Sequence, residues 1–324
     1  MDDLILSATN TWLSAINRPM VRGYRGAHGR PPDIACPSSY TERMFWRKVV
    51  DRNPDFAMFS DKLATKDYLR RVCPELPVPR TLWVGSSAAD IPDELLQQDV
   101  FVKANHGSSF NFRTRGRPCE RAELCRLTNG WLATNYGVDS GEWPYALVQR
   151  KLFVEEPVGD AGADLLELSI RASNGKPILG SVLGKSKLPG QWAYYLDADG
   201  APTWGMSDPE GSAIVPLPPG LNILEPYRRA VQFTRRLSIG VDYARFDFFW
   251  NGTRLYGGEI TLFPAGGTLD PTHSQCHRII REGWDLRESH FLKTPQSGLK
   301  RIYAGALRRR LNRDRAGLKN NHPA

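Results

Sequence analysis

The sequence lacks several features that would each have indicated a particular class of protein. None of its apolar runs approaches the roughly 20 residues that a membrane-spanning helix requires. The N-terminus has aspartates before a short apolar stretch and no basic leader, so it does not resemble a signal peptide. The five cysteines form no CxxC pair and are odd in number, which argues against a disulfide framework or a zinc site. These absences predict a cytoplasmic protein with reduced thiols.

Positive charge is in excess, but it is unevenly distributed. The net charge is +8, and residues 298–324 account for +7 of it, with eight Lys and Arg against one Asp. The rest of the chain has no base-stacking motif, so we expect no nucleic-acid partner. A basic amphipathic helix in this tail is indicated by apolar residues near one helical face: Leu299, Ile302, Tyr303, Ala306 and Leu311. Such a helix is suited to an anionic membrane or an acidic polymer, and equally to packing on the protein body.

Helix signals concentrate early in the chain and strand signals mostly later. Ser39 to Glu42 has the spacing of a capping box and predicts a helix within 37–52, and a second helix is expected over 60–72. Asn-Gly pairs predict hairpins of strands 164–172 with 177–183 and 245–250 with 254–262. Other expected elements are strands at 81–84, 100–103, 110–113 and 146–154, and helices near 124–131 and 225–237. This order predicts the α+β class.

A lysine at the end of an expected strand precedes a loop of small residues. Lys103 ends the strand 100–103, and Asn105 to Ser109 follow. Loop amides could approach an anion closely there, and the lysine would add a positive charge. The pattern indicates a flap over phosphate groups, although a polar hairpin with a surface lysine has the same sequence. His106 in this loop is compatible with a proton shuttle or with a hydrogen bond to backbone.

Two carboxylates occur on consecutive strands of the last expected hairpin. Arg245 and Asp247 share one face of the first strand because side chains alternate, and Glu259 and Thr261 share a face of the second. Oxygen ligands of this kind suit Mg²⁺, although an Asp and a Glu on a solvated sheet face would have the same pattern.

The register of this hairpin decides whether the two carboxylates meet. A two-residue turn would place Asp247 and Glu259 on opposite faces of the sheet. We therefore predict a three-residue turn or a β-bulge at Gly257-Gly258, either of which would set Glu259 opposite Arg245 and diagonal to Asp247.

A third stretch, containing Asp61, Lys62 and Lys66, reads by itself as a helix with surface lysines. Taken together, the three stretches resemble the ATP-grasp superfamily, and within it the teichuronopeptide-biosynthesis (TupA-like) branch. The resemblance extends over roughly residues 37–290. The runs that carry it most closely are Ser60–Lys62, Thr81–Gly85, Phe101–Ser108, Trp131–Gly137 and Gly258–Thr261.

The resemblance implies a role for each matching residue. The nucleotide phosphates would be contacted by Lys62, Lys103, His106, Gly107, Ser108, Ser109, Lys185 and Lys187. The adenine would be read by a hinge that includes Glu155, Glu156 and Val158, and the ribose by Asp164 or Glu167. The catalytic cations would be Arg245 and Lys103, and the Mg²⁺ ligands Asp247, Glu259 and Thr261. The substrate would approach Gly266 and Gly267.

Three residues depart from the patterns that the resemblance suggests. Ser109 stands where the branch prefers glycine, and Ser169 stands where it usually has lysine. Thr261 replaces the asparagine common in the wider superfamily. The first two departures put the flexibility of the flap and one phosphate or substrate contact in doubt.

The implied activity is an ATP-dependent carboxylate–amine ligase that works through an acyl phosphate, with ATP and Mg²⁺ as cofactors. The carboxylate would be a uronic acid or a similar group in cell-surface polysaccharide or peptide-polymer assembly. The alternatives are a kinase that phosphorylates a hydroxyl and a nucleotide-binding module without catalysis. The implied fold is an ATP-grasp with an N-terminal lobe (1–98), a lid subdomain (99–154), a catalytic lobe (155–297) and the basic tail (298–324).

Overall fold

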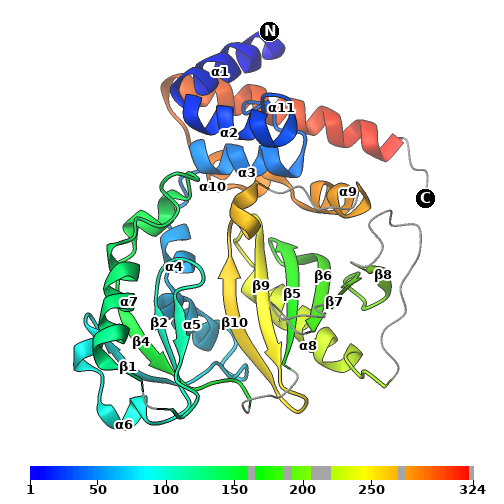
Figure 1. The fold of residues 1–324 in the computed structure, drawn as a ribbon. Helices are drawn as coiled ribbons and strands as arrows, with labels where there is room; N and C mark the ends of the chain where they lie inside the picture. Colours follow the sequence, from blue (N-terminus) through cyan, green and yellow to red (C-terminus); the bar gives the residue numbers. More distant parts are fainter. Residues whose placement is uncertain (118, 160–164, 185–191, 206–219, 269–273, 321–324) are drawn as a thin grey trace.

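The computed structural model describes residues 1–117, 119–159, 165–184, 192–205, 220–268 and 274–320. Strands in these ranges form two antiparallel sheets that lie side by side beneath a layer of helices (Figure 1). Both ends of the chain build this layer, through α1 (Asp2–Ile16), α2 (Arg18–His28), α3 (Tyr40–Val49), α10 (His290–Lys293) and α11 (Gly298–Asn320). The predicted α+β class is confirmed. No helix in the described ranges is long and apolar enough to cross a membrane.

The smaller sheet has its own apolar core. Its strands, in spatial order, are β1 (Thr81–Gly85), β4 (Leu152–Glu155), β2 (Phe101–Ala104) and β3 (Asn111–Arg113). The core is closed by η1 (Ala88–Asp90), α6 (Asp93–Leu96) and α7 (Arg121–Ala133). The predicted strands near 81–84, 100–103 and 110–113 are confirmed. Strand β1 precedes the boundary predicted at residue 98 but pairs with β4, so this sheet draws on both sides of that boundary.

One strand prediction in this region is wrong. The strand expected over 146–154 is confined to β4, because Trp143–Leu147 forms the 3₁₀ helix η2. Pro144 lies in the first turn of η2, where its fixed φ suits a helical start and its missing N–H is not needed. The helix predicted around Leu124 and Trp131 is confirmed as α7, although Leu127 on it is 40% exposed.

The larger sheet contains both predicted hairpins. Its strands, in spatial order, are β10 (Leu255–Thr261), β9 (Ala244–Trp250), β5 (Leu166–Ser173), β6 (Lys176–Gly184), β7 (Trp192–Leu196) and β8 (Pro202–Gly205). Helix α8 (Leu224–Leu237) covers one face, where Phe233 stacks 6.5 Å from Phe248. Because side chains alternate along a strand, Arg245 and Asp247 point to the other face.

Predicted helix starts are confirmed where a side chain caps them. Ser39 Oγ accepts a hydrogen bond from the Glu42 amide at 3.2 Å, and Glu42 Oε2 accepts one from the Ser39 amide at 3.0 Å, which completes the capping box of α3. Helix α4 (Phe56–Ser60) leads into α5 (Lys62–Val72), where Asp61 Oδ1 accepts a hydrogen bond from the Leu63 amide at 2.9 Å. The remaining elements are α9 (Ser274–Gly283), η3 (Pro264–Gly267) and η4 (Leu286–Glu288).

The basic tail packs on the protein body as helix α11. Tyr303 is 6% exposed, and its Oη donates a hydrogen bond to the Ala35 carbonyl at 3.0 Å. Several tail arginines form ion pairs with acidic residues: Arg309 with Asp2 (2.8 Å), Arg313 with Asp2 (3.2 Å) and Arg315 with Asp285 (3.4 Å). Packing on the body is therefore the reading of the tail that the described residues support.

A buried pair of carboxyl groups beneath the helical layer makes stability depend on pH. Asp51 and Asp242 are 0% and 1% exposed, and within the described chain Asp51 Oδ2 and Asp242 Oδ1 have no hydrogen-bond partner. Burial and the negative charge of Asp242 raise the pKa of Asp51 to about 7. The native state therefore holds a proton that the unfolded chain releases near pH ~4. This group's contribution to the free energy of unfolding is expected to fall as the pH rises from about 4 to about 7.

The substitution Asp51→Asn is expected to make the free energy of unfolding decrease less as the pH rises, because the amide does not titrate in this range. Thermal melts of wild type and variant at several values between roughly pH 4.5 and 7.5 measure the difference. The wild-type midpoint should decline relative to that of the variant as the pH rises. Parallel profiles would show that Asp51 has an ordinary pKa.

Candidate active site

A β-bulge in the last hairpin brings the predicted metal ligands to one face of the larger sheet. Strands β9 and β10 pair Gly257 with Phe248 and then, one residue out of step, Ile260 with Phe246. Gly258 and Glu259 therefore both oppose Asp247, which is the two-against-one arrangement of a bulge. The prediction of a bulge here is confirmed.

The predicted partner of Arg245 is wrong. Thr261 rather than Glu259 lies opposite Arg245, because the turn spans four residues, 251–254. Asn251 holds this longer turn: its Oδ1 accepts a hydrogen bond from the Arg254 amide at 2.8 Å and one from the Thr253 amide at 3.1 Å. In an Asx-type turn of this kind the asparagine side chain accepts backbone hydrogen bonds, and it is an alternative to the two-residue Asn-Gly turn.

Asp247 is held by groups from three strands. Its carboxylate is 2% exposed and accepts hydrogen bonds from Arg245, Nε to Oδ1 at 2.7 Å and Nη2 to Oδ2 at 2.6 Å. Ser169, directly opposite on β5, donates Oγ to Oδ1 at 2.6 Å, and Thr261 donates Oγ1 to Oδ2 at 3.2 Å. The carboxylate is thus oriented by a guanidinium and two hydroxyls.

Arg245 and Glu259 extend this cluster toward helix α5. Burial lowers the pKa of Arg245, but the charge and hydrogen bonds of Asp247 outweigh it, and Glu259 and Glu167 raise the pKa further. Glu259 is exposed, and its negative charge also offsets the lowering of the Lys62 pKa by burial. The cluster therefore has a buried carboxylate and an exposed one, with cations on two sides.

The donor set fits Mg²⁺ in kind. Asp247, Glu259 and Thr261 offer hard oxygen atoms on one face, and Mg²⁺ commonly takes one or two carboxylates and completes its shell with phosphate oxygens and water. The described residues contain no group of three or more acidic, histidine or cysteine side chains able to hold a metal ion by themselves. Binding here would therefore depend on a phosphorylated ligand, and on Arg245 releasing one oxygen of Asp247.

Two lysines meet on one carboxylate of the smaller sheet, where the central strands β2 and β4 lie next to α5. Lys103 of β2 donates to Glu155 Oε1, and Lys66 Nζ of α5 lies 2.5 Å from Glu155 Oε2. Burial raises the pKa of Glu155, but the two lysines outweigh it, so the net pKa lies below the ordinary value. The Glu155 side chain is therefore a counter-ion to the lysines, which leaves only the backbone of residues 155–158 for the predicted hinge.

Lys66 was expected on the helix surface, but the structure places it in the candidate site. It is 6% exposed, and Nζ also donates to the Pro79 carbonyl at 2.9 Å. The spacing Lys62 to Lys66 contained the signal, since residues four apart lie on the same helical face.

Lys62 ties the predicted flap to the start of α5. Its Nζ donates to the Gly107 carbonyl, and its amide donates to the Asn105 carbonyl at 2.8 Å. Gly107 and Ser109 both have left-handed backbones, with φ of 72° and 63°. Glycine adopts this conformation without steric cost and serine does not, so the glycine expected at 109 has a conformational reason.

Other residues predicted to contact the nucleotide differ in placement. The His106 ring is 1% exposed and 5.5 Å from the Phe110 ring, and burial lowers its pKa. A nucleotide contact of residue 106 stays a prediction. Glu156 forms an exposed ion pair with Arg80 at 2.5 Å. Glu167 shares the face of Ser169, two residues away on β5. Asp164, Lys185 and Lys187 lie outside the described residues.

The predicted substrate turn is flanked by opposite charges. Gly266 and Gly267 have φ of 63° and 65°, and a Cβ on Gly267 would lie 2.8 Å from Met44 Cβ. Lys48 Nζ donates to the Gly266 carbonyl at 2.5 Å, and a Cβ on Gly266 would lie 3.6 Å from Glu142 Oε1. Burial lowers the pKa of Lys48 to about 8, partly offset by Glu142. No local sequence signal pointed to Lys48 or Glu142, because they come from α3 and from the segment before η2.

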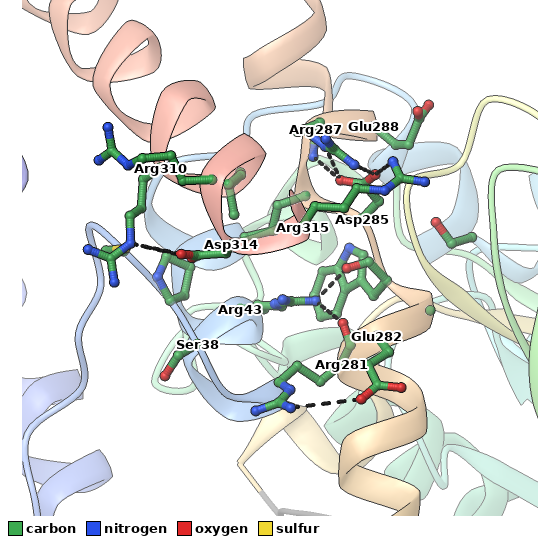
Figure 2. A pocket seen from close by; sticks show the side chains of 18 of the residues that line it. Ser38, Arg43, Arg281, Glu282, Asp285, Arg287, Glu288, Arg310, Asp314 and Arg315 are labelled. Carbon is green, nitrogen blue, oxygen red and sulfur yellow. Dashed lines mark hydrogen bonds and ion pairs between the residues drawn. The ribbon is translucent and has the colours of Figure 1, made fainter. Parts of the chain in front are cut away.

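A cavity of about 1370 Å³ lies away from all these residues, between α1, α9 and α11. Most of the charged side chains in Figure 2 are paired with one another, as in Arg310 with Asp314 at 3.1 Å and Arg287 with Asp285 at 2.5 Å. None of the predicted nucleotide, metal or substrate residues lines it. The candidate active site is therefore the cluster between the two sheets.

Comparison with known proteins gives only distant likenesses. No protein-family model matches the chain, and no curated protein matches its sequence. Among solved structures, it is similar to the D-alanine–D-alanine ligase of Bacillus anthracis complexed with ATP, at 15% identity and a TM-score of 0.39, over 79% of this chain and 68% of that one. For the D-alanine–D-alanine ligase of Helicobacter pylori the identity is 15% and the TM-score is 0.44, over 75% of this chain and 67% of that one. For the L-amino acid ligase of Bacillus licheniformis the identity is 12% and the TM-score is 0.44, over 75% of this chain and 55% of that one. At these values the likenesses assign no site and no reaction.

Proposed function

We propose that this protein is an ATP-dependent carboxylate–amine ligase with an ATP-grasp fold. The observation that carries the proposal is the bulge at Gly258–Glu259, which puts Asp247, Glu259 and Thr261 on one face beside Arg245. Lys62 is close enough to Glu259 for the charges to influence each other. A carboxylate and ATP are both anions, so a site that joins them must offset their repulsion and the charge that develops in transfer.

The proposed reaction has two steps. A carboxylate oxygen attacks the γ-phosphorus of ATP, the bond to the bridging oxygen breaks, and ADP leaves with an acyl phosphate formed. An amine nitrogen then attacks the acyl carbon, phosphate leaves, and the nitrogen loses a proton. Arg245, Lys62 and Lys103 would stabilise charge on the phosphoryl oxygens. Mg²⁺, when held by Asp247, Glu259 and Thr261, would add positive charge at the same oxygens.

The remaining roles are proposed from the resemblance together with residue positions. The loop Asn105–Ser109, whose Gly107 carbonyl Lys62 holds, would cover the phosphates and keep water from the acyl phosphate. Backbone groups of residues 155–158 would bind adenine, and Glu167 the ribose. Gly266 and Gly267 would lie next to the substrate, between Lys48 and Glu142.

A finer proposal concerns the substrate. The runs that resemble the TupA-like branch support a uronic acid or a similar carboxylate of a cell-surface polymer as the acceptor. Lys185 and Lys187 are proposed as phosphate contacts on that resemblance alone. Identification of the product tests this proposal. A carboxylate of another kind in the product would contradict both the proposed substrate and the proposed TupA-like branch.

Trapping with hydroxylamine tests the reaction. The protein is incubated with ATP, Mg²⁺, hydroxylamine and a panel of carboxylates that includes uronic acids and amino acids. A hydroxamate formed together with ADP is the expected result, because hydroxylamine captures an acyl phosphate. A stable phosphorylated product would show a kinase instead. ATP binding without turnover across the panel would indicate a nucleotide-binding module and overturn the ligase.

A further inference from the structure

The first helix has two apolar faces, and only one of them is covered by protein. Leu6 and Leu13 point into the core and are 5% exposed. Leu4, Trp12 and Ile16 are 76%, 59% and 56% exposed and, at spacings of eight and four residues, follow one oblique row on the side of α1 that the protein leaves uncovered. A helix that is apolar over so much of its circumference is normally buried on more than one side.

The start of the last helix extends this stripe. Leu299 and Ile302 are 83% and 49% exposed. Arg309 and Arg313 pair with Asp2, and the helices run in opposite directions (Figure 1), so the start of α11 lies beside the later turns of α1. Six of the twelve large apolar side chains that are exposed in the described chain belong to this region, here called the bare face: Met1, Leu4, Trp12, Ile16, Leu299 and Ile302.

Exposed positive charge without a counter-ion occurs on the two helices that contact α1. From residue 4 to residue 32 the sequence has four arginines and no acidic residue, and one of the four, Arg30, pairs with Glu42 at 2.5 Å. Among the described residues, five exposed cations of α2 and early α11 form no ion pair: Arg18, Arg22, Arg25, Lys300 and Arg301. The later arginines of α11 differ, because Arg310 and Arg315 are engaged by Asp314 and Asp285 (Figure 2).

We propose that the bare face docks on the surface of an anionic lipid bilayer. An exposed tryptophan among aliphatic side chains, bordered by cations, suits the boundary between headgroups and acyl chains. The unpaired cations add attraction to anionic headgroups. A second copy of this chain fits less well, since a symmetric contact would bring the same cations together.

Vesicle sedimentation with the full chain tests the proposal. We expect binding to vesicles that contain phosphatidylglycerol, weaker binding to phosphatidylcholine alone, and loss of the difference at high salt. The double variant Leu4→Glu/Trp12→Glu should weaken binding at least about tenfold, because both side chains lose their apolar contact with lipid. The double variant Arg22→Glu/Arg301→Glu should weaken binding by about tenfold or more on the anionic vesicles only.

A matched control places the same charge on another exposed apolar residue. Leu127→Glu alters a side chain that is 40% exposed on α7, far along the chain from the bare face, and should leave vesicle binding unchanged. Circular dichroism checks that each variant folds. Hydroxamate formation, measured without vesicles, distinguishes a failure of membrane docking from a failure of the proposed reaction. Binding that is absent, or that persists in both double variants, overturns the proposal. So does a dimer in solution that Leu4→Glu/Trp12→Glu dissociates while vesicle binding is absent.

Discussion

Asp247→Asn is expected to lower kcat/KM for ATP-dependent hydroxamate formation by about 10²- to 10³-fold, the usual effect of removing one preorganised charge from such a site. Asparagine keeps the shape of the side chain and one acceptor oxygen. It removes the charge that would bind Mg²⁺ and the charge that fixes Arg245, whose Nε and Nη2 lie 2.7 Å and 2.6 Å from the two carboxylate oxygens. The measurement is steady-state hydroxamate formation over a range of ATP and Mg²⁺ concentrations.

The control for this experiment removes a half-buried carboxylate that also binds an arginine but lies outside the candidate site. Asp99 forms an ion pair with Arg113 at 2.7 Å at the opposite end of β2 from Lys103, and Asp99→Asn should leave turnover within about twofold. Ser169→Ala removes only the hydroxyl that donates to Asp247 Oδ1 at 2.6 Å, and its effect should be far smaller than that of Asp247→Asn. Near-wild-type turnover in a folded Asp247→Asn protein would end the metal assignment.

Arg47→Met is expected to lower the free energy of unfolding by about 3–5 kcal/mol, because it leaves a buried aspartate without its cation. Arg47 is 0% exposed and donates to Asp242 Oδ2 at 2.8 Å, to the Tyr243 carbonyl at 2.9 Å and to the Leu262 carbonyl at 2.9 Å. Its guanidinium also lies 4.5 Å from the Trp284 ring centroid. A loss of this size is a large part of the roughly 5–15 kcal/mol that stabilises a typical domain.

Urea titration followed by tryptophan fluorescence measures this loss. Arg113→Met, which breaks a half-buried pair on the smaller sheet, serves as the matched control and should cost about 1 kcal/mol or less. The loss of free energy of unfolding for Arg47→Lys should lie between the losses for Arg47→Met and Arg113→Met. Lysine keeps the charge but lacks the planar fork that reaches three acceptors. A cost for Arg47→Met no larger than that for Arg113→Met would show that Arg47 does not hold the helical layer.

Arg47 also connects the fold to the candidate site. The residue belongs to α3, while its acceptors at Asp242, Tyr243 and Leu262 flank the hairpin of β9 and β10. The buried ion pair therefore fixes the strands that carry Asp247 and Glu259 against the helical layer. Loss of Arg47 should reduce activity through stability, and not through the chemistry of the site.

Local signals predicted helices α3, α5, α7 and α8 and most strands of the two sheets, but not helices α1 and α2. The capping box at Ser39 and the N-cap Asp61 place their helices correctly, because a cap is satisfied within a few residues. Strand alternation placed Arg245 and Asp247 on the same face for an equally local reason. The strand expected over 146–154 formed only as β4, because Trp143–Leu147, with Pro144 in its first turn, is a 3₁₀ helix.

The contacts of the site were only partly predictable. The bulge was expected on the physical ground that the two carboxylates must share a face, but the pairing of Thr261 with Arg245 depended on a side-chain hydrogen bond in the turn. Lys66, Lys48 and Glu142 were missed because their partners are distant in sequence.

Local sequence patterns were thus enough to predict capped helix starts, the side chains that share a strand face, and the excess of positive charge near the C-terminus. Three features became visible only in the folded protein: Glu155 neutralises two lysines, Asp247 is held by three neighbours, and much of the tail's charge is paired while cations of α2 are not. The difference lies in the sequence separation over which each interaction acts. Caps and alternation depend on bonds and sterics within a few residues, whereas a charge acquires its counter-ion only when distant segments pack together.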